Sequence, residues 1–292
     1  MEKIQLIVTG DMEVKSLADS LRTHFPDVRG GQDVTWPKPR RTPGSTSNRL
    51  RADAEPSTAM TNLAKAMVAE VIAGRTGAPA DLVIVIDDVE LDNMGQEQIV
   101  ASLFRKAVRA ELDRRRHNSD MRTHDRNVQS VRERCSFHVL RPMPEAYFFG
   151  DPLALQRAGA IQSPILLNTT DVEEFEVTDP AWLPICHATN QQHAACGRHW
   201  WRHEIHPKEY LAHLVGQNDP IGYSETIHGA AALANLNWPE VPKVAGDVMF
   251  ARALFQDIAD WFDVTSPMPG LTSDLFYPGK GIRHDALLIR NM

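Results

Sequence analysis

The sequence has few cysteines and no long hydrophobic run. The 292 residues include only three cysteines, Cys135, Cys186 and Cys196, which are too scattered to form a disulfide framework. No apolar segment approaches the roughly 20 residues that span a bilayer. The first residues, MEKIQLIVTGDMEV, lack the basic start and long apolar stretch of a secretory signal. These absences predict a cytoplasmic protein in a reducing environment, with no membrane contact.

Several catalytic signatures are also missing. The sequence contains no GxxxxGK[ST] phosphate loop, so we do not expect this chain alone to hydrolyse ATP. It contains no GxSxG nucleophile turn, and none of its cysteines stands in a recognised nucleophile context. Nucleoside triphosphate hydrolysis and acyl transfer are therefore not the expected chemistries.

Charge is unevenly distributed along the chain. The net charge of −7 argues against a general nucleic-acid coat protein. Residues 1–141 nevertheless carry a net charge of +2, whereas residues 142–292 carry −9. The basic residues of the first half form two clusters: Lys38, Arg40, Arg41, Arg49 and Arg51, then Arg105, Lys106, Arg109, Arg114, Arg115 and Arg116. Each cluster is either ordinary solvated surface or a phosphate-facing surface, and both interpretations stay open.

The apolar pattern predicts an α/β fold. Residues 3–9 and 81–87 are apolar and rich in β-branched residues, which is typical of strands covered on both faces. The remaining expected elements are helices near 12–24, 57–75, 95–116 and 143–159 and strands at 135–140 and 163–168. This alternation of strands and helices predicts a parallel, Rossmann-like sheet with crossover helices.

The two ends of the chain differ in character. Residues 1–170 are expected to form the α/β core, with a long mobile loop at 29–56 that is rich in glycine and proline. Residues 171–292 read as a histidine-rich and mainly helical extension, with helices near 207–215, 226–236 and 247–262. This extension is either a separate region or continuous with the core.

Carboxylates follow the two clearest strands. The first strand leads into Asp11 and Glu13, and the strand at 81–87 leads into Asp87, Asp88, Glu90 and Asp92. If the strands are neighbours, these acids meet beyond the carboxyl ends of the sheet, where ligands bind in open α/β folds. Such oxygen ligands suit magnesium, which can support phosphodiester cleavage. The alternative is that the acids only end a strand and cap the helix that follows.

The pairing of strand-G-D-x-E with strand-D-D-x-E resembles Toprim domains, the catalytic cores of topoisomerases, primases and overcoming-lysogenization-defect nucleases. More closely, the chain is similar to a family of uncharacterised bacterial Toprim-like proteins. The resemblance is carried by IVTGDMEVKSLADSL at 7–21, DLVIVIDDVELDN at 81–93, RPMPEAYFFGDPLAL at 141–155 and HPKEYLAHL at 206–214. It implies a Toprim-like α/β core.

The resemblance also assigns site residues. Glu13 matches the second acid of the first motif, Asp88 and Glu90 match the paired acids of the later strand, and Glu145 matches an acid of the PEAYFFGD-like segment. Thr9 stands where Toprim domains usually carry a glutamate, and Asp88-x-Glu90 replaces the usual Asp-x-Asp. A threonine cannot supply the missing charge, so Glu13 or Asp11 would have to substitute for it.

The resemblance implies two functions. The first is a nuclease dependent on magnesium or manganese, with Glu13, Asp87, Asp88, Glu90 and Asp92 as metal ligands and Glu145 completing the catalytic set. Nucleic acid would be its substrate, and a partner ATPase is expected because related proteins are found beside ATPases in phage-defence gene clusters. The second is a catalytically impaired adaptor or sensor subunit that binds a protein partner.

Six of the twelve histidines fall between His187 and His213, near two of the three cysteines. Zinc prefers thiolate and imidazole ligands, and its ligands here would be Cys186, Cys196, His199 and one of His203 and His206. The spacing matches no standard zinc finger, and His203-Glu204-Ile205-His206 is one residue short of HExxH. A packed cluster of histidines without zinc is the alternative.

Overall fold

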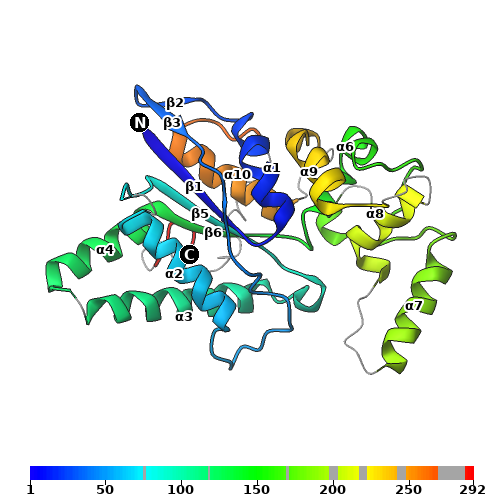
Figure 1. Ribbon diagram of the computed structural model, residues 1–292, viewed down its shortest axis with the longest axis horizontal. Helices are drawn as coiled ribbons and strands as arrows, with labels where there is room; N and C mark the ends of the chain where they lie inside the picture. Colours follow the sequence, from blue (N-terminus) through cyan, green and yellow to red (C-terminus); the bar gives the residue numbers. More distant parts are fainter. Residues whose placement is uncertain are drawn as a thin grey trace.

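The computed structural model describes residues 1–74, 77–117, 119–168, 171–196, 203–216, 222–241, 248–268 and 287–292. Within them the chain folds into a mixed, mostly parallel sheet with helices on both faces (Figure 1). A cluster of helices built from later residues lies beyond one end of the sheet, on the right of the view.

The strands are β1 (Glu2–Val8), β2 (Val28–Arg29), β3 (Gln32–Thr35), β4 (Arg40–Arg41), β5 (Leu82–Asp88) and β6 (Cys135–Leu140). The α-helices are α1 (Asp11–Arg22), α2 (Thr58–Ile72), α3 (Glu97–Arg116), α4 (Met121–Arg134), α5 (Glu145–Phe148), α6 (Pro152–Arg157), α7 (Leu183–Ala195), α8 (Pro207–Val215), α9 (Ala230–Ala234) and α10 (Met249–Phe262). Shorter helical turns are η1 (Leu91–Asn93), η2 (Val172–Glu174), η3 (His203–Ile205), η5 (Glu225–Gly229, a π-helix) and η6 (Trp238–Glu240).

The sheet has the order β2-β3-β1-β5-β6, with β4 also beside β1. Strands β1 and β5 are parallel, and their register runs from Ile4 opposite Leu82 to Val8 opposite Ile86. Strand β6 is parallel to β5 on its other side. The predicted parallel pairing of the first two clear strands is therefore confirmed, as is the strand at 135–140.

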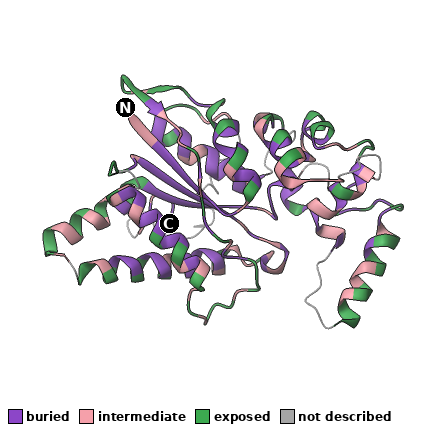
Figure 2. Cartoon of the chain, in the orientation of Figure 1, coloured by how far each residue is buried: buried purple, intermediate pink, exposed green. Residues whose placement is uncertain are grey.

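Both faces of the sheet are buried, as Figure 2 shows. Alternate residues of a strand point to opposite faces, so Leu6 and Ile84 pack toward α1 and α10, whereas Val83 and Val85 pack toward α2 and α3. This double burial explains why these strands are continuous apolar runs rather than alternating ones.

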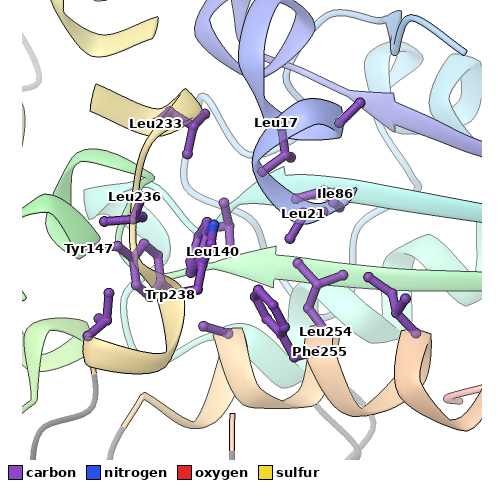
Figure 3. Packing of buried hydrophobic residues seen from close by; sticks show 14 of the residues in the cluster. Leu17, Leu21, Ile86, Leu140, Tyr147, Leu233, Leu236, Trp238, Leu254 and Phe255 are labelled. Atoms are coloured by element: carbon purple, nitrogen blue, oxygen red, sulfur yellow. The ribbon is translucent and has the colours of Figure 1, made fainter. Parts of the chain in front are cut away.

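Aromatic and aliphatic side chains join the late helical segments to the first face (Figure 3). Trp238 is fully buried against Tyr147 and Phe255, with ring centroids 5.3 and 5.5 Å away. Its indole N–H donates to the Ser20 hydroxyl at 2.9 Å, so its polar atom is satisfied inside the core.

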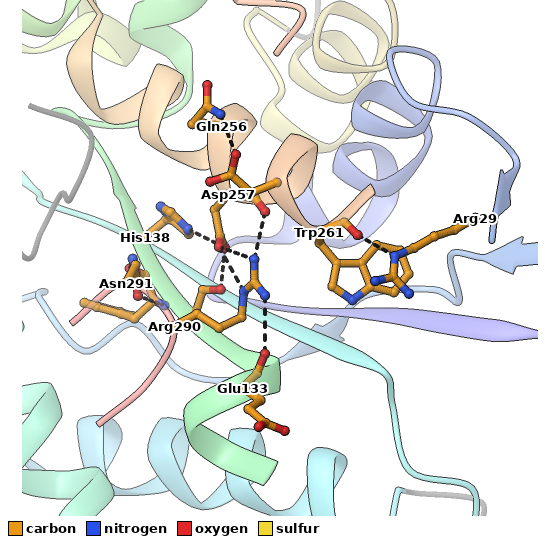
Figure 4. A network of polar contacts seen from close by, with 11 residues as sticks. Arg29, Glu133, His138, Gln256, Asp257, Trp261, Arg290 and Asn291 are labelled. Carbon is orange, nitrogen blue, oxygen red and sulfur yellow. Dashed lines mark hydrogen bonds and ion pairs between the residues drawn. The ribbon is translucent and has the colours of Figure 1, made fainter. Parts of the chain in front are cut away.

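Two buried carboxylates fix α10 to the rest of the fold. Glu173 accepts hydrogen bonds from the first N–H groups of the helix, at Phe250 and Ala251, and from the Tyr147 hydroxyl. Near the middle of the helix, Asp257 accepts from Arg290 Nε at 3.0 Å and lies 3.1 Å from His138 Nε2 on β6 (Figure 4). Glu173 thus ties the start of the helix to α5, and Asp257 ties its middle to β6 and to the last residues of the chain.

The segment 29–56, predicted to be a mobile loop, is not a loop throughout, and its mobility stays a prediction. That segment forms β3 and β4, which follow the free edge of β1: Val34 pairs with Glu2, and Arg40 pairs with Ile7. It then buries Ser45 and Thr46. The backbone N–H and C=O groups on this edge of β1 need hydrogen-bond partners. Even a segment rich in proline can supply them through short strands.

The strand expected at 163–168 is also wrong. Only Leu166 forms a bridge, with Val177 and antiparallel, away from the central sheet. Helices α4 and α7 have no counterpart among the expected elements. Only Val131 of α4 and Cys186 of α7 are fully buried, so neither helix carries a wide apolar stripe in its sequence.

Residues on both sides of position 170 share one apolar cluster, which includes Leu17, Leu140, Leu233 and Leu254. The division of the chain at 170 remains a prediction. Within the described ranges, no helix is both long and apolar enough to cross a bilayer.

Replacing Asp257 with Asn should destabilise the protein at neutral pH. Burial raises the pKa of this carboxyl, but the bond to His138 and the charge of Arg290 outweigh burial and hold the pKa at about 2. Because this pKa is lower folded than unfolded, the stabilisation is present above about pH 4 and is lost as the pH falls toward 2. We expect Asp257→Asn to lower the free energy of unfolding by about 2–4 kcal/mol at pH 7, measured by urea denaturation.

Asp260→Asn is the matched control, because Asp260 is exposed on the same helix and its carboxylate accepts a hydrogen bond from the Gln256 amide. A loss as large for Asp260→Asn as for Asp257→Asn, or a loss for Asp257→Asn that is undiminished at pH 2, would contradict this account.

Candidate functional site

A pocket of about 390 Å³ opens beyond the carboxyl ends of β1 and β5. Seven carboxylate residues line it: Glu13, Asp87, Asp88, Glu90, Glu145, Glu209 and Glu225. Lys208 is the only Lys or Arg among its described lining residues. The structure thus brings together Glu13, Asp88, Glu90 and Glu145, the acids that the sequence singled out.

The Asp87 carboxylate is held by four hydrogen bonds. Its Oδ1 accepts from the Thr9 hydroxyl at 2.7 Å and from the Asp88 N–H at 3.0 Å. Its Oδ2 accepts from the N–H of Ser45 at 3.1 Å and from the Ser45 hydroxyl. Burial raises the pKa of Asp87, and these bonds oppose the rise. The Thr9 hydroxyl at the end of β1 therefore anchors the Asp87 carboxylate at the end of β5.

Asp88 also lines the pocket, but its carboxylate is held less completely than that of Asp87. Its Oδ1 is buried and accepts no hydrogen bond in the described part of the chain. Burial, followed by the charges of Glu13 and Glu90, holds the pKa of Asp88 well above its usual value. An unpaired buried oxygen of this kind is costly and is stabilised by a proton or a cation.

Glu90 reaches the pocket through an unusual backbone conformation. Its φ is 59° and its ψ is 156°, a region that only glycine adopts easily, at a cost of about 1–3 kcal/mol for other residues. Its N–H donates to Pro142 O at 3.0 Å, which extends the pairing of β5 and β6 into the site. Burial and then the charge of Asp87 raise the pKa of Glu90 to about 7.

Glu13 folds back over the first turn of α1. A Cβ atom at Gly10 would lie 2.2 Å from Glu13 Oε2, so only glycine leaves room for this carboxylate. Burial is the largest influence on Glu13 and raises its pKa to about 8, with the charge of Glu145 adding to the effect.

Three residues at the site, Lys208, Tyr223 and Glu225, were not predicted from the sequence. Lys208 Nζ donates to Glu225 Oε2 at 2.6 Å, and the Tyr223 hydroxyl donates to Glu145 Oε1 at 3.2 Å. Burial lowers the pKa of Lys208, but the bond to Glu225 and the charge of Glu145 raise it overall, so the ammonium stays charged. Lys208 lies in the segment HPKEYLAHL, and the resemblance of this segment was the one feature of the sequence that could have pointed to it.

Two predicted ligands lie elsewhere. Asp11 is exposed and pairs with Arg41 at 2.8 Å, so it does not substitute for the missing glutamate. Asp92 belongs to η1 and does not line the pocket, although its charge contributes to the raised pKa of Glu90.

The predicted zinc ligands are not assembled in the described residues. The Cys186 thiol is buried and donates to Leu183 O at 3.2 Å, whereas Cys196 is exposed. His203 and His206 are buried neighbours with ring centroids 6.0 Å apart. His199 lies outside the described residues. Zinc binding stays a prediction.

The pocket offers mainly carboxylate oxygens as donor atoms, because seven Asp and Glu residues line it. Among the described residues, no three His, Cys, Asp or Glu side chains form a ready ligand set. Magnesium does not require one, because it typically takes one or two carboxylates and completes its shell with water and phosphate. The buried, unpaired Asp88 Oδ1 and the raised pKa values of its neighbours are what a site needing positive charge would show.

The pocket acids should make the protein less stable as the pH rises. The pKa of Glu13 is raised from 4.5 to about 8, so its favourable contribution is complete below pH 4.5 and is lost as the pH rises through 8. Glu13→Gln should therefore raise the melting temperature at pH 8.5, by an amount equivalent to about 1–3 kcal/mol, and change it little at pH 4.5. Thermal unfolding across this pH range, without divalent cations, measures both.

Asp11→Asn provides the control, since Asp11 lies on the same helix and is exposed. An equal gain in Asp11→Asn, or a Glu13→Gln protein that is less stable than wild type at pH 8.5, would show that the Glu13 carboxylate is not under strain from burial.

Comparisons with known proteins assign no family or function to this chain. No family model, curated protein or solved structure matches the chain. Its function is therefore inferred from the residues that line the pocket and from their contacts.

Proposed function

We propose that this pocket binds magnesium or manganese and that the protein cleaves phosphodiester bonds in nucleic acid. The observation that carries the proposal is the buried Asp88 Oδ1, which accepts no hydrogen bond from the described residues and lies among carboxylates whose negative charges repel one another. This arrangement is costly for folding and becomes favourable only when positive charge enters the pocket.

Asp88 and Glu90 would hold the cation, and Glu13 would support it from the first turn of α1. When bound, such a cation would activate a water and neutralise charge on the reacting phosphate. The chain's own contribution is to fix these carboxylates. Asp87 is held by Thr9 and Ser45, and it orients the following residue through the Asp88 N–H.

Lys208 would contact the phosphate. Its ammonium is the one Lys or Arg charge in the described lining, and Glu225 holds it at 2.6 Å on the wall opposite the strand ends. A lysine in this place attracts a phosphate into a pocket that its acids alone would make repulsive. Tyr223 holds Glu145 beside it.

Cleavage assays on plasmid, single-stranded DNA and tRNA, with magnesium or manganese, test the proposal. Asp88→Asn keeps the shape of the side chain and removes its charge, so it should lower the cleavage rate by about 100-fold or more, equivalent to several kcal/mol. The cation should also raise the melting temperature of the wild type, and this rise should shrink in Asp88→Asn.

Asp92→Asn is the matched control, because Asp92 follows the same strand but lies outside the pocket. It should cleave within a few-fold of the wild type. Equal cleavage by wild type and Asp88→Asn would assign the activity to another site or to a contaminant.

The second candidate is an adaptor subunit for a protein partner such as an ATPase. Three large apolar side chains, Ile161, Ile165 and Leu167, are exposed within one short stretch, with Leu167 63% exposed. Apolar groups that gather in this way favour a protein contact. Absence of cleavage by a folded wild-type protein, on every substrate and with either cation, would favour this function over the first.

A further inference from the structure

The helical hairpin of α3 and α4 carries a net positive charge in a chain that is acidic overall. Residues 105–134 contain ten Lys and Arg against five Asp and Glu, so the segment is +5 in a chain whose net charge is −7. Nine of these ten cations are arginine. The remainder of the molecule is therefore strongly acidic.

Part of this charge is already neutralised. Arg114 and Arg115 both pair with the buried Glu111, and Lys106 pairs with Glu55 at 2.6 Å. Six exposed arginines have no carboxylate within 4.0 Å in the part of the chain that the structure describes. They are Arg109, Arg116, Arg122, Arg126, Arg132 and Arg134.

The arginines of α3 also oppose one another. Arg105 and Arg109 are one turn apart, and burial, followed by the charge of Arg109, lowers the pKa of Arg105. Arg105 Nε is buried and has no hydrogen-bond partner among the described residues. Like charges at this spacing destabilise a helix, and an anion between them would relieve the repulsion. The planar guanidinium group of arginine can form paired hydrogen bonds with a phosphate group, whereas the ammonium group of lysine acts as a point charge.

This surface is far from the pocket. Helix α3 is 20 residues long and so spans about 30 Å, and it begins at Glu97, shortly after the pocket residue Glu90. Its far end and α4 lie on the left of Figure 1, at the opposite end of the molecule from α8, which carries Lys208. The exposed arginines are thus not among the described residues that line the pocket.

We propose that the exposed side of the α3–α4 hairpin binds the phosphate backbone of a polynucleotide. This inference rests on the proposed function, and it deepens it: the substrate is a long nucleic acid that reaches from the pocket to the hairpin. A span of about 30 Å corresponds to about nine base pairs of duplex. Mononucleotides and short oligonucleotides would occupy the pocket without gaining affinity from the hairpin.

The test is the salt dependence of binding to a labelled 24-base-pair DNA duplex without divalent cations. The variant Arg109→Gln/Arg116→Gln/Arg122→Gln/Arg126→Gln changes only exposed side chains. Each phosphate contact contributes about 0.9 to the slope of log affinity against log salt. We expect the slope to fall by about 2–4 and the affinity at low salt to fall by about 100-fold.

The matched control is Lys15→Gln/Arg22→Gln/Lys65→Gln/Arg157→Gln, which removes the same number of exposed positive charges elsewhere. It should leave the slope within about one unit of the wild type. An equal fall in the control, an unchanged slope in the hairpin variant, or equally tight hairpin-dependent binding of polyglutamate would overturn the proposal. The last result would assign the surface to acidic proteins.

Two further measurements separate this inference from the function of the pocket. Asp88→Asn should keep its affinity for the duplex while losing cleavage, and the hairpin variant should cleave a small phosphodiester such as the p-nitrophenyl ester of thymidine monophosphate as fast as wild type. Duplex binding without any cleavage would remove the pocket proposal and leave the hairpin proposal standing. Cleavage without hairpin-dependent binding would do the reverse.

Discussion

The hydrogen bonds to the Asp87 carboxylate join three parts of the chain at the carboxyl edge of the sheet. Thr9 comes from the end of β1, Ser45 from the segment that follows the edge strands, and the Asp88 N–H from β5 itself. A buried carboxylate without such donors would cost several kcal/mol. These bonds therefore hold the ends of β1 and β5 and the segment with Ser45 together at the pocket, where the pairing of β5 with β6 places Asp88.

Charge in the pocket is only partly compensated. Lys208 supplies positive charge on one wall, while Glu13, Asp88 and Glu90 remain crowded on the other. Burial raises the pKa values of these three acids, and the strained φ of Glu90 adds to the cost. Sites that oppose stability in this way are common where binding or catalysis needs them. His206, Lys208, Glu209 and Glu225 also line this pocket, although they are more than 100 residues away from the strand ends along the chain.

Much of the fold could be predicted because the central strands are buried on both faces. The runs at β1, β5 and β6 are apolar for that reason, and their order along the chain implies parallel pairing. The short strands β3 and β4 were not predictable, since they are polar and form through pairing with β1 and, for β3, also with β2. Helix α4 was missed because it buries only Val131 completely, which leaves no apolar periodicity to detect.

The site residues, like the strands, could be predicted only where a local sequence pattern marks them. Acids placed directly after strands could be found from the sequence, because parallel strands end at one edge. The role of Thr9 could not, since its hydroxyl matters only through Asp87, which is 78 residues away in the chain. Lys208 and Glu225 face each other across 17 residues, and no spacing rule predicts that pair. Asp11 and Glu13 are two residues apart on one helix, yet only Glu13 turns inward, because Gly10 leaves room for it.

The most direct test of the account is the location of a bound manganese ion. Crystals grown or soaked with manganese chloride should show one strong anomalous peak in contact with Asp88, with Glu90 or Glu13 as a further ligand. The same peak should be absent from Asp88→Asn crystals treated in the same way. No peak in the pocket at millimolar manganese, or a peak bound only by residues outside it, would contradict the claim that these carboxylates form a cation site.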